Sequence, residues 1–396
     1  MYVKYNRIFT IVLDSVGTGS APDAAKFNDE GADTLNSVAL AFEGNLEIPN
    51  LEKMGIGNLR EKPLLGIDAQ EEPLAYFGTM TEQSIGKDSI DGHWEMMGML
   101  TPDVDTFPNG FPVDLIDKVK AHTNRGVVAN KPMSGTTVIE EYGQHHVETG
   151  DLIVYTSGDS VFQIAAHEDI VPVEELYAIC EYVRTLVNGP EYTLGRVIAR
   201  PFIGNNETGF IRTDRRHDYA LQPTDKSTLD ILSDNGFKTI GIGKISDLFA
   251  GQGIQLSYHN KDNMDGMDHL DEVMTQDFTG LCFVNLVDFD SKYGHRRDPI
   301  GFGKELELFD TRLGTVLEEL KADDLLIITA DHGNDPGFSG SDHTRELVPL
   351  LVYSPSFIGV GNLGRRHTFA DVGATIAENF GLAGTGMGES FLKILE

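Results

Sequence analysis

The stretch LLIITADHGNDPGFSGSDHTRE, residues 325–346, joins a short apolar run to a glycine-rich segment with five aspartate and histidine side chains. A run of this length, bounded by turn residues, is typical of a strand buried on both faces of a parallel sheet. The polar residues begin where the run ends. The sequence therefore predicts a strand whose carboxyl end presents potential metal ligands.

Other apolar runs of the same kind occur along the chain, at residues 7–14, 238–247, 281–290 and 349–355. Segments with a helical pattern separate several of them, at 226–236 and 303–324. Alternation of strands and helices indicates an α/β domain with a mostly parallel central sheet flanked by helices.

Polar residues follow the carboxyl ends of four of these runs. They are Asp14, Lys244, Asp288, Asp290, Asp331 and His332. Open α/β sheets bind ligands just outside the carboxyl ends of their strands. We therefore expect acids, a lysine and a histidine to meet at one edge of the sheet.

The segment 101–220 has a different pattern, with an amphipathic helix over 173–187 and strand-like runs at 151–157 and 195–202. We interpret it as an inserted, smaller α/β domain, which leaves 1–100 and 221–396 as a discontinuous core. Basic residues gather late in the insertion: Arg196, Arg200, Arg212, Arg215, Arg216 and His217. Such a patch suggests an anion-binding surface. Ion pairing with the many carboxylates is the alternative.

The composition limits the partners that the chain can bind. Its 396 residues include 31 Lys plus Arg and 62 Asp plus Glu, for a formal charge of −31. This charge repels nucleic acids and anionic membranes. A phosphorylated ligand would need metal cations or a local cluster of Lys and Arg to overcome the negative field.

The cysteines and the apolar runs indicate the cellular compartment in which we expect the protein. Cys180 and Cys282 both lie in apolar contexts, so a disulfide framework is not expected and the cytoplasm is the predicted location. The first residues lack a signal-peptide pattern, and no segment approaches 18 apolar residues, so we expect no membrane span. Nothing in the sequence identifies a protein partner.

Three groupings of aspartate and histidine stand out: Asp290 with His295, Asp331 with His332, and His343 in SDHTRE. With Asp14 they form a set of carboxylates and imidazoles that suits Mn²⁺, Zn²⁺, Fe²⁺ or Mg²⁺. Each pair alone is more often a hydrogen-bonded neighbour pair. Together they are too many for one open site and fit two metals, which can clamp a phosphoryl group.

The segment SIGKDSIDGHWEMMG, residues 84–98, is the other dense stretch. Ser89 lies near Lys87 and is a candidate nucleophile if a metal lowers the pKa of its hydroxyl. The alternative is a turn followed by a helix N-cap, where Ser and Asp are common.

These motifs resemble those of the alkaline phosphatase-like metalloenzymes and, among them, the bacterial phosphopentomutase family. The similar segments run nearly end to end, and include DSVGTGSAPDA, GKDSIDGHWE, GRVIARPF, RRHDYAL, IGKISD, GHRRDP and ITADHGNDP. The resemblance implies an alkaline phosphatase-like core with an inserted cap. It also implies an isomerase of nucleoside salvage whose small-molecule substrates are ribose 1-phosphate, ribose 5-phosphate and their 2-deoxy counterparts.

The resemblance also implies roles for individual residues. Ser89 corresponds to the residue that takes the phosphoryl group, although the family usually has threonine there and this chain has IDGHWE in place of TGHWE. The implied mechanism passes through a phosphoserine enzyme and a sugar bisphosphate, with a bisphosphate as the priming activator and the cap as a lid. One Mn²⁺ is assigned to Asp290, His295 and His343, the other to Asp14, Asp331 and His332, and substrate contacts to Asp159, Arg196, Arg212 and Lys244.

Three other functions remain open from the sequence. A phosphatase or phosphodiesterase of the same architecture would transfer the phosphoryl group to water. A metal-dependent phosphoglycerate mutase would use a serine nucleophile on a substrate that carries a carboxylate. A non-catalytic cation-binding protein would explain the acidity, but histidines at strand ends favour transition-metal ligation.

Overall fold

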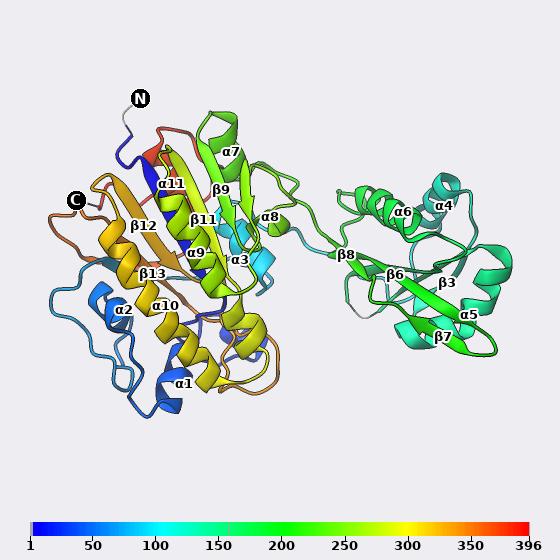
Figure 1. The fold of residues 1–396 in the computed structure, drawn as a ribbon, viewed down its shortest axis with the longest axis horizontal. Coiled ribbons are helices and arrows are strands. Elements are labelled where there is room, and N and C mark those ends of the chain that lie inside the picture. Colours follow the sequence, from blue (N-terminus) through cyan, green and yellow to red (C-terminus); the bar gives the residue numbers. More distant parts are fainter. Residues whose placement is uncertain (1–2, 158, 396) are drawn as a thin grey trace. The chain divides into compact units, whose positions relative to one another are not determined.

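The chain folds into two compact units in a computed structural model that describes residues 3–157 and 159–395. The larger unit comprises Met1–Thr101 and Asp225–Glu396, and the smaller unit comprises Pro102–Thr224. Each has its own sheet and its own helices (Figure 1).

An eight-stranded sheet forms the larger unit, in the order β10-β9-β11-β1-β12-β13-β2-β14. Its strands are β1 (Arg7–Leu13), β2 (Tyr76–Met80), β9 (Lys238–Ile242), β10 (Leu256–Tyr258), β11 (Gly280–Leu286), β12 (Asp324–Thr329), β13 (Val348–Tyr353) and β14 (Asn362–Arg366). β13 is antiparallel to both of its neighbours, whereas the other paired strands are parallel. The predicted α/β class with a mostly parallel sheet is confirmed.

The five apolar runs identified in the sequence are β1, β9, β11, β12 and β13. The runs at 238–247 and 281–290 were predicted too long, because β9 ends at Ile242 and β11 ends at Leu286. Gly243 has φ +80° and turns the chain, and Ile245–Leu248 then form the short helix α8. The short strands β2, β10 and β14 have no clear apolar run and were not predicted.

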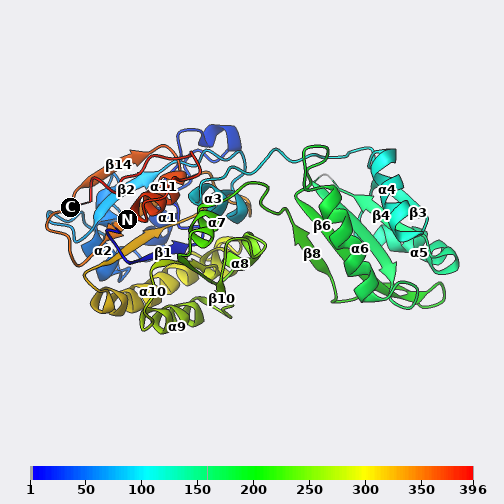
Figure 2. The same ribbon diagram turned by 90° about the horizontal axis from the view of Figure 1, so that it is seen from above.

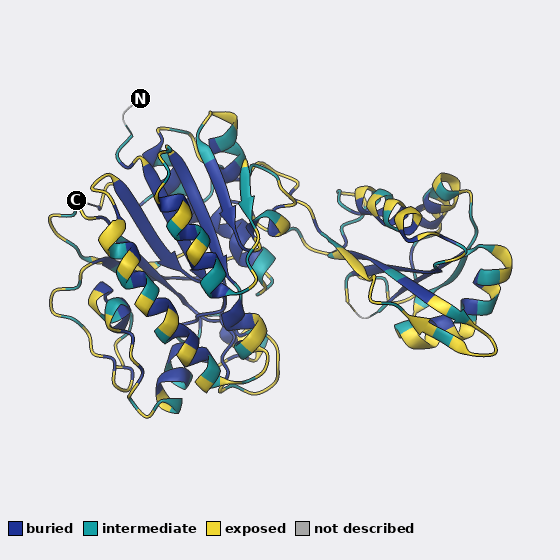
Figure 3. Cartoon of the chain, viewed as in Figure 1, coloured by how far each residue is buried: buried dark blue, intermediate teal, exposed yellow. Residues whose placement is uncertain are grey.

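Helices cover both faces of this sheet. They are α1 (Thr34–Ala41), α2 (Pro49–Met54), α3 (Ser89–Met96), α7 (Thr228–Asp234), α9 (Asn263–Met274), α10 (Pro299–Glu319) and α11 (Ala370–Asn379), with shorter turns η1 (Ala24–Phe27), η2 (Ile56–Leu59) and η3 (Phe289–Gly294). α9 and α10 lie on one side of the sheet and α11 on the other (Figure 2). α10 buries Phe302, Leu306, Phe309 and Leu313 at helical spacing, and its outer stripe is exposed (Figure 3).

The smaller unit is a second α/β layer structure with its own core. Its strands are β3 (Val127–Pro132), β4 (Leu152–Thr156), β5 (Val161–His167), β6 (Arg196–Asn205), β7 (Gly209–Arg212) and β8 (His217–Ala220). One face of this sheet packs against α4 (Val113–Thr123) and α6 (Val173–Leu186), and the other against α5 (Gly135–Thr149). Cys180 lies in the first core, and both cysteines are unpaired and buried.

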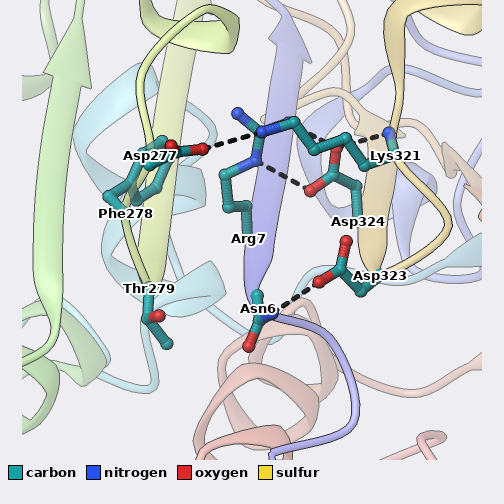
Figure 4. A pocket seen from close by; sticks show the side chains of 8 residues that line it. All are labelled: Asn6, Arg7, Asp277, Phe278, Thr279, Lys321, Asp323 and Asp324. Carbon is teal, nitrogen blue, oxygen red and sulfur yellow. Dashed lines mark hydrogen bonds and ion pairs between the residues drawn. The ribbon is translucent and has the colours of Figure 1, made fainter.

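Charged pairs close the amino ends of the parallel strands in the larger unit. Arg7 donates to both carboxylate oxygens of Asp324, at 2.8 and 2.6 Å, and to two backbone carbonyls. These residues line a cavity of about 340 Å³ together with Lys321, which pairs with Asp277 (Figure 4). Arg7 and Lys321 already have carboxylate partners there. The ion pairs around this cavity therefore have a structural role.

Within the described residues, no helix combines the length and the apolarity that a membrane crossing requires.

Candidate metal centre

Three adjacent strands in the middle of the sheet, β11, β1 and β12, place the candidate ligands at their carboxyl ends. Asp14 follows β1 directly, and Asp331 and His332 come two and three residues after the end of β12. Asp290 lies in η3, a wide helical turn after β11, and His295 is its C-cap. The strand order therefore brings together residues that lie hundreds of positions apart in the sequence.

The first group consists of Asp14, Asp331 and His332. All three are buried, and their ligand atoms lie within 4.8 Å of one another. His332 Nε2 is 3.5 Å from Asp14 Oδ1 and 3.5 Å from Asp331 Oδ2. Neither of these carboxylate oxygens has a hydrogen-bond partner, although both are buried. Burial of such unpartnered carboxylate oxygens costs free energy unless a cation lies beside them.

The second group consists of Asp290, His332 and His343, whose ligand atoms also lie within 4.8 Å of one another. His295 adjoins this group, with its Nε2 3.2 Å from Asp290 Oδ2 and 3.1 Å from His343 Nε2. His332 thus belongs to both groups and joins them. All six sequence-predicted ligands meet in one cluster, and His332 is more central than the sequence suggested.

The histidines point the same ring nitrogen into the cluster. Nδ1 of His295 bonds Ser341 O at 2.8 Å, Nδ1 of His343 bonds Lys87 O at 2.8 Å, and Nδ1 of His332 bonds Gly333 O at 3.1 Å. A carbonyl oxygen only accepts, so Nδ1 carries the proton and Nε2 is free to ligate. Facing lone pairs on His295 and His343 would repel each other unless a cation lies between them. The cluster therefore fits divalent metal ions.

The electrostatics of the cluster also call for positive charge. Burial and the nearby Asp331 raise the pKa of Asp14 well above its usual range. Burial lowers the pKa of His332, but Asp331 and Asp14 outweigh it and raise that pKa to about 9. In the absence of an ion, the carboxylates therefore hold a proton on His332. A divalent metal would take its place, and the nitrogen and oxygen donors suit Mn²⁺, Zn²⁺, Fe²⁺ or Mg²⁺.

Neighbouring amide groups orient the carboxylates. Asn285 donates to Asp14 Oδ2 at 2.8 Å, Asn334 donates to Asp290 Oδ1 at 2.7 Å, and the Ser15 amide donates to Asp331 Oδ1 at 3.0 Å. Sequence reasoning missed both asparagines. Asn285 is fully buried inside the otherwise apolar strand β11, and this polar interruption was the available signal.

Ser89 is the first residue of α3, and its Oγ lies 3.4 Å from His332 Nε2. The N-cap of α3 is Asp88, whose carboxylate accepts from the amides of Ile90 and Asp91. The hydroxyl of Ser89 is therefore not used for capping and faces the cluster. α3 closely approaches the segment that follows β12, because a Cβ on Gly92 would lie 2.1 Å from Asp331 O.

His93 is a further residue at this site to which the sequence reasoning gave no role. Its Nδ1 donates to Ser89 O at 2.8 Å and lies 3.2 Å from Asp331 Oδ2. The ring is fully buried and packs near Phe283 of β11. His93 thus ties the residue that carries the hydroxyl to the end of the central sheet.

None of the four residues assigned to substrate belongs to the two groups of candidate ligands. Asp159, Arg196 and Arg212 belong to the smaller unit, and Lys244 belongs to the larger unit as the N-cap of α8. All four are exposed.

Arg212 has cationic neighbours within the smaller unit. Arg200, Arg212 and Arg216 line a cavity of about 260 Å³ with Pro201 and Thr213. Arg216 pairs with Asp218, whereas Arg200 donates to the neutral side chain of Gln163 at 2.9 Å. The basic patch that the sequence predicted is therefore only partly neutralised by ion pairs.

Two aspartates of the loop after β12 have other partners. Asp335 accepts from the amides of Asp33 and Gly337, at 2.8 and 2.7 Å, which stabilises the turn. Asp342 contacts Lys87 at 3.4 Å.

Comparison with known proteins gives the same family along the whole chain. Residues 6–384 match the model of the metalloenzyme superfamily. The chain is 58% identical over 395 residues to a protein of Levilactobacillus brevis named phosphopentomutase, with 100% of both chains covered. It is 59% identical over 393 residues to the phosphopentomutase of Limosilactobacillus reuteri, with 99% of both chains covered.

Among solved structures, phosphoglycerate mutase of Leishmania mexicana aligns with 98% of this chain and 99% of its own, at 12% identity and a TM-score of 0.48. The two full-length relatives are much closer in sequence.

Proposed function

The chain belongs to the phosphopentomutase family of the metalloenzyme superfamily, and from this membership we propose that it interconverts α-D-ribose 1-phosphate and D-ribose 5-phosphate. The 2-deoxyribose equivalents are included in the proposal. The observation that carries it, beside the identity, is the Ser89 hydroxyl 3.4 Å from His332 within the cluster of six candidate ligands. A hydroxyl in this position can carry a phosphoryl group.

The cluster would hold two divalent ions, and we propose Mn²⁺ as the native metal. Asp14, Asp331 and His332 would bind one ion, and Asp290, His295 and His343 the other, with His332 close to both. When bound, such ions stabilise the negative charge of a phosphoryl group and lower the pKa of a nearby hydroxyl.

Ser89 would exchange the phosphoryl group with the sugar. A bisphosphate activator first phosphorylates Ser89. The phosphoserine then donates to the free hydroxyl of a pentose monophosphate, so that the bond from phosphorus to Oγ breaks, a bond to the sugar oxygen forms, and the sugar hydroxyl proton ends on Ser89. The resulting bisphosphate reorients and returns its other phosphate, which leaves the isomer and a phosphorylated enzyme.

The smaller unit would act as a cap that binds the sugar and keeps water out. We keep Asp159 as the proposed contact to sugar hydroxyls, with Arg196, Arg212 and Lys244 as proposed contacts to the distal phosphate. The partly unneutralised arginines around the cavity beside Arg212 support anion binding by this unit. The two unpaired cysteines favour the cytoplasm as the location. The proposed reaction would serve nucleoside salvage there.

The test is mass spectrometry of the full chain after treatment with a sugar bisphosphate, alongside an assay with ribose 1-phosphate. We expect a phosphoryl adduct on Ser89 and formation of ribose 5-phosphate. Ser89→Ala should abolish both and leave the metal content unchanged, whereas Ser89→Thr restores the residue usual in the family and should stay active.

Other outcomes would select the alternatives. Release of phosphate without ribose 5-phosphate would identify a phosphatase, and turnover of phosphoglycerate without pentose phosphates would identify a phosphoglycerate mutase. Mutase activity in Ser89→Ala would remove Ser89 from the mechanism.

A further inference from the structure

Two loops of the larger unit meet beside the metal centre. Residues 82–88 lead into Ser89, and residues 342–346 carry His343. His343 Nδ1 donates to the carbonyl of Lys87 at 2.8 Å, and Arg345 Nη1 donates to the carbonyl of Gly86 at 2.9 Å. A metal ligand is therefore oriented by the backbone that places the nucleophile.

Asp29 connects the same two loops from a third segment. Its Oδ2 accepts from the Lys87 ammonium at 2.9 Å and from the Arg345 amide at 2.8 Å. Asp29 is only 5% exposed, so this charged contact is shielded from water and is stronger than a surface pair. One buried carboxylate thus holds both loops at once.

Lys87 lies two residues before Ser89, where a free lysine could bind the substrate phosphate. Its ammonium is already matched by Asp29, and it also lies 3.4 Å from Asp342, a largely exposed carboxylate. The Lys87 side chain itself is 16% exposed. A lysine in this setting acts on the loops and not on a ligand.

We propose that Lys87 and Asp29 form a positioning pair that sets His343 and Ser89 at a fixed separation. The ammonium and carboxylate fix residue 87, the carbonyl of residue 87 fixes the His343 ring, and the chain continues from residue 87 into the N-terminus of α3. The pair thereby couples metal binding at the Asp290, His332 and His343 group to the place of the nucleophile. This inference rests on the proposed roles of the cluster and of Ser89.

The test is a double-mutant cycle with Asp29→Asn, Lys87→Met and the double variant, each as the full chain stripped of metal. Mn²⁺ is titrated calorimetrically, and kcat and KM are measured with ribose 1-phosphate. Each single variant should weaken one Mn²⁺ binding step by about 10-fold to 100-fold, as loss of an orienting partner does. kcat should fall with little change in KM. In the double variant, the loss of Mn²⁺ affinity and of kcat should not exceed the larger of the two single-variant losses.

Lys226→Met is the matched control, since Lys226 also pairs with an aspartate in the larger unit but on the exposed surface. It should match the parent protein in every readout. If Lys87→Met does not fold, the Mn²⁺ titration and kinetics of Asp29→Asn alone test the proposal.

Several results would overturn the proposal. The first is unchanged Mn²⁺ affinity and kcat in folded Asp29→Asn, and the second is additive losses in the double variant. The third is a rise in KM alone, which would identify Lys87 as a ligand of the substrate phosphate. Failure of the proposed function is distinguishable, because the unmutated chain would then form no Ser89 adduct while the Mn²⁺ titrations still test the pair.

Discussion

Glu346 lies at the end of the loop that carries His343 and is fully surrounded by protein. Its carboxylate accepts from the Gly19 and Thr34 amides and from the Thr34 and Thr344 hydroxyls, at 2.7–3.1 Å. The space is tight, because a Cβ on Gly17 would lie 2.3 Å from Glu346 Oε2. Burial raises the pKa of Glu346 to about 7, and the hydrogen bonds only partly oppose this.

This shift predicts how Glu346 contributes to stability as pH changes. The folded pKa of about 7 is above the ordinary 4.5, so the folded state holds the proton more tightly. The contribution is therefore fully present below about pH 4.5 and is lost as pH rises through 7. We expect Glu346→Gln, whose amide can donate to the two threonine hydroxyls, to gain stability relative to the parent by up to about 3 kcal/mol over this range.

Urea unfolding at several pH values, with saturating Mn²⁺, measures this difference. A difference between Glu346→Gln and the parent that stays constant from pH 4.5 to 7.5 would contradict the expectation. Thr344→Val, which removes one donor and keeps the carboxylate, should steepen the loss of stability with rising pH.

Single residues show which parts of the site could be predicted from sequence. Asp14 and Asp331 follow apolar runs, so their place at the carboxyl ends of two strands predicted that they meet. Asn334 and His93 could not be found in this way, because their roles depend on contacts between segments that the local pattern does not encode. His332 was assigned to one metal, whereas its Nε2 faces both groups.

At the scale of elements, α3 determines where Ser89 lies. Asp88 caps the helix, and Asp91 Oδ2 accepts from the Asp88 amide at 3.3 Å, so that a capping box fixes the first turn. Ser89 is the next residue after the cap. An error in the first turn therefore moves the Ser89 hydroxyl directly.

We expect Asp88→Ala to lower the free energy of unfolding by about 1 kcal/mol, as loss of an N-cap usually does. The loss of kcat should be larger than this stability change implies, because the hydroxyl of Ser89 loses its fixed position. Ser227→Ala is the matched control, since Ser227 caps α7 with the same kind of box away from the cluster. Steady-state kinetics and urea unfolding of both variants make the comparison.

Equal kcat in the two variants would show that the cap of α3 has no role beyond stability. The elements themselves were largely predictable: long apolar runs became strands, and the helix predicted at 303–324 became α10, which ends earlier, at Glu319. Its start at Pro299 was missed, because Asp298 caps the helix from outside the apolar pattern.

At the scale of the whole molecule, the chain has separate cores in its two units, and all six candidate metal ligands lie in the larger one. Within the cluster, Asp331 and Asp290 repel the Asp14 carboxylate, so a bound cation is favoured. Ions that bind only the folded state stabilise it, by about 2.7 kcal/mol at a concentration of 100 times Kd. Metal should therefore stabilise the larger unit directly and the smaller unit only if the two unfold together.

Hydrogen exchange followed by mass spectrometry, with and without EDTA, can distinguish these cases. On metal removal we expect faster exchange at residues 331–346 and at the carboxyl ends of β1, β11 and β12, because the buried carboxylates lose their neutralising charge. β4 and β5, which are buried within the core of the smaller unit, should keep their protection. Restoration of slow exchange by Mn²⁺ separates ion loss from irreversible unfolding. Equally accelerated exchange in β4 and β5 would mean that the two units unfold together. Unchanged exchange at residues 331–346 would show that metal does not bind at this loop.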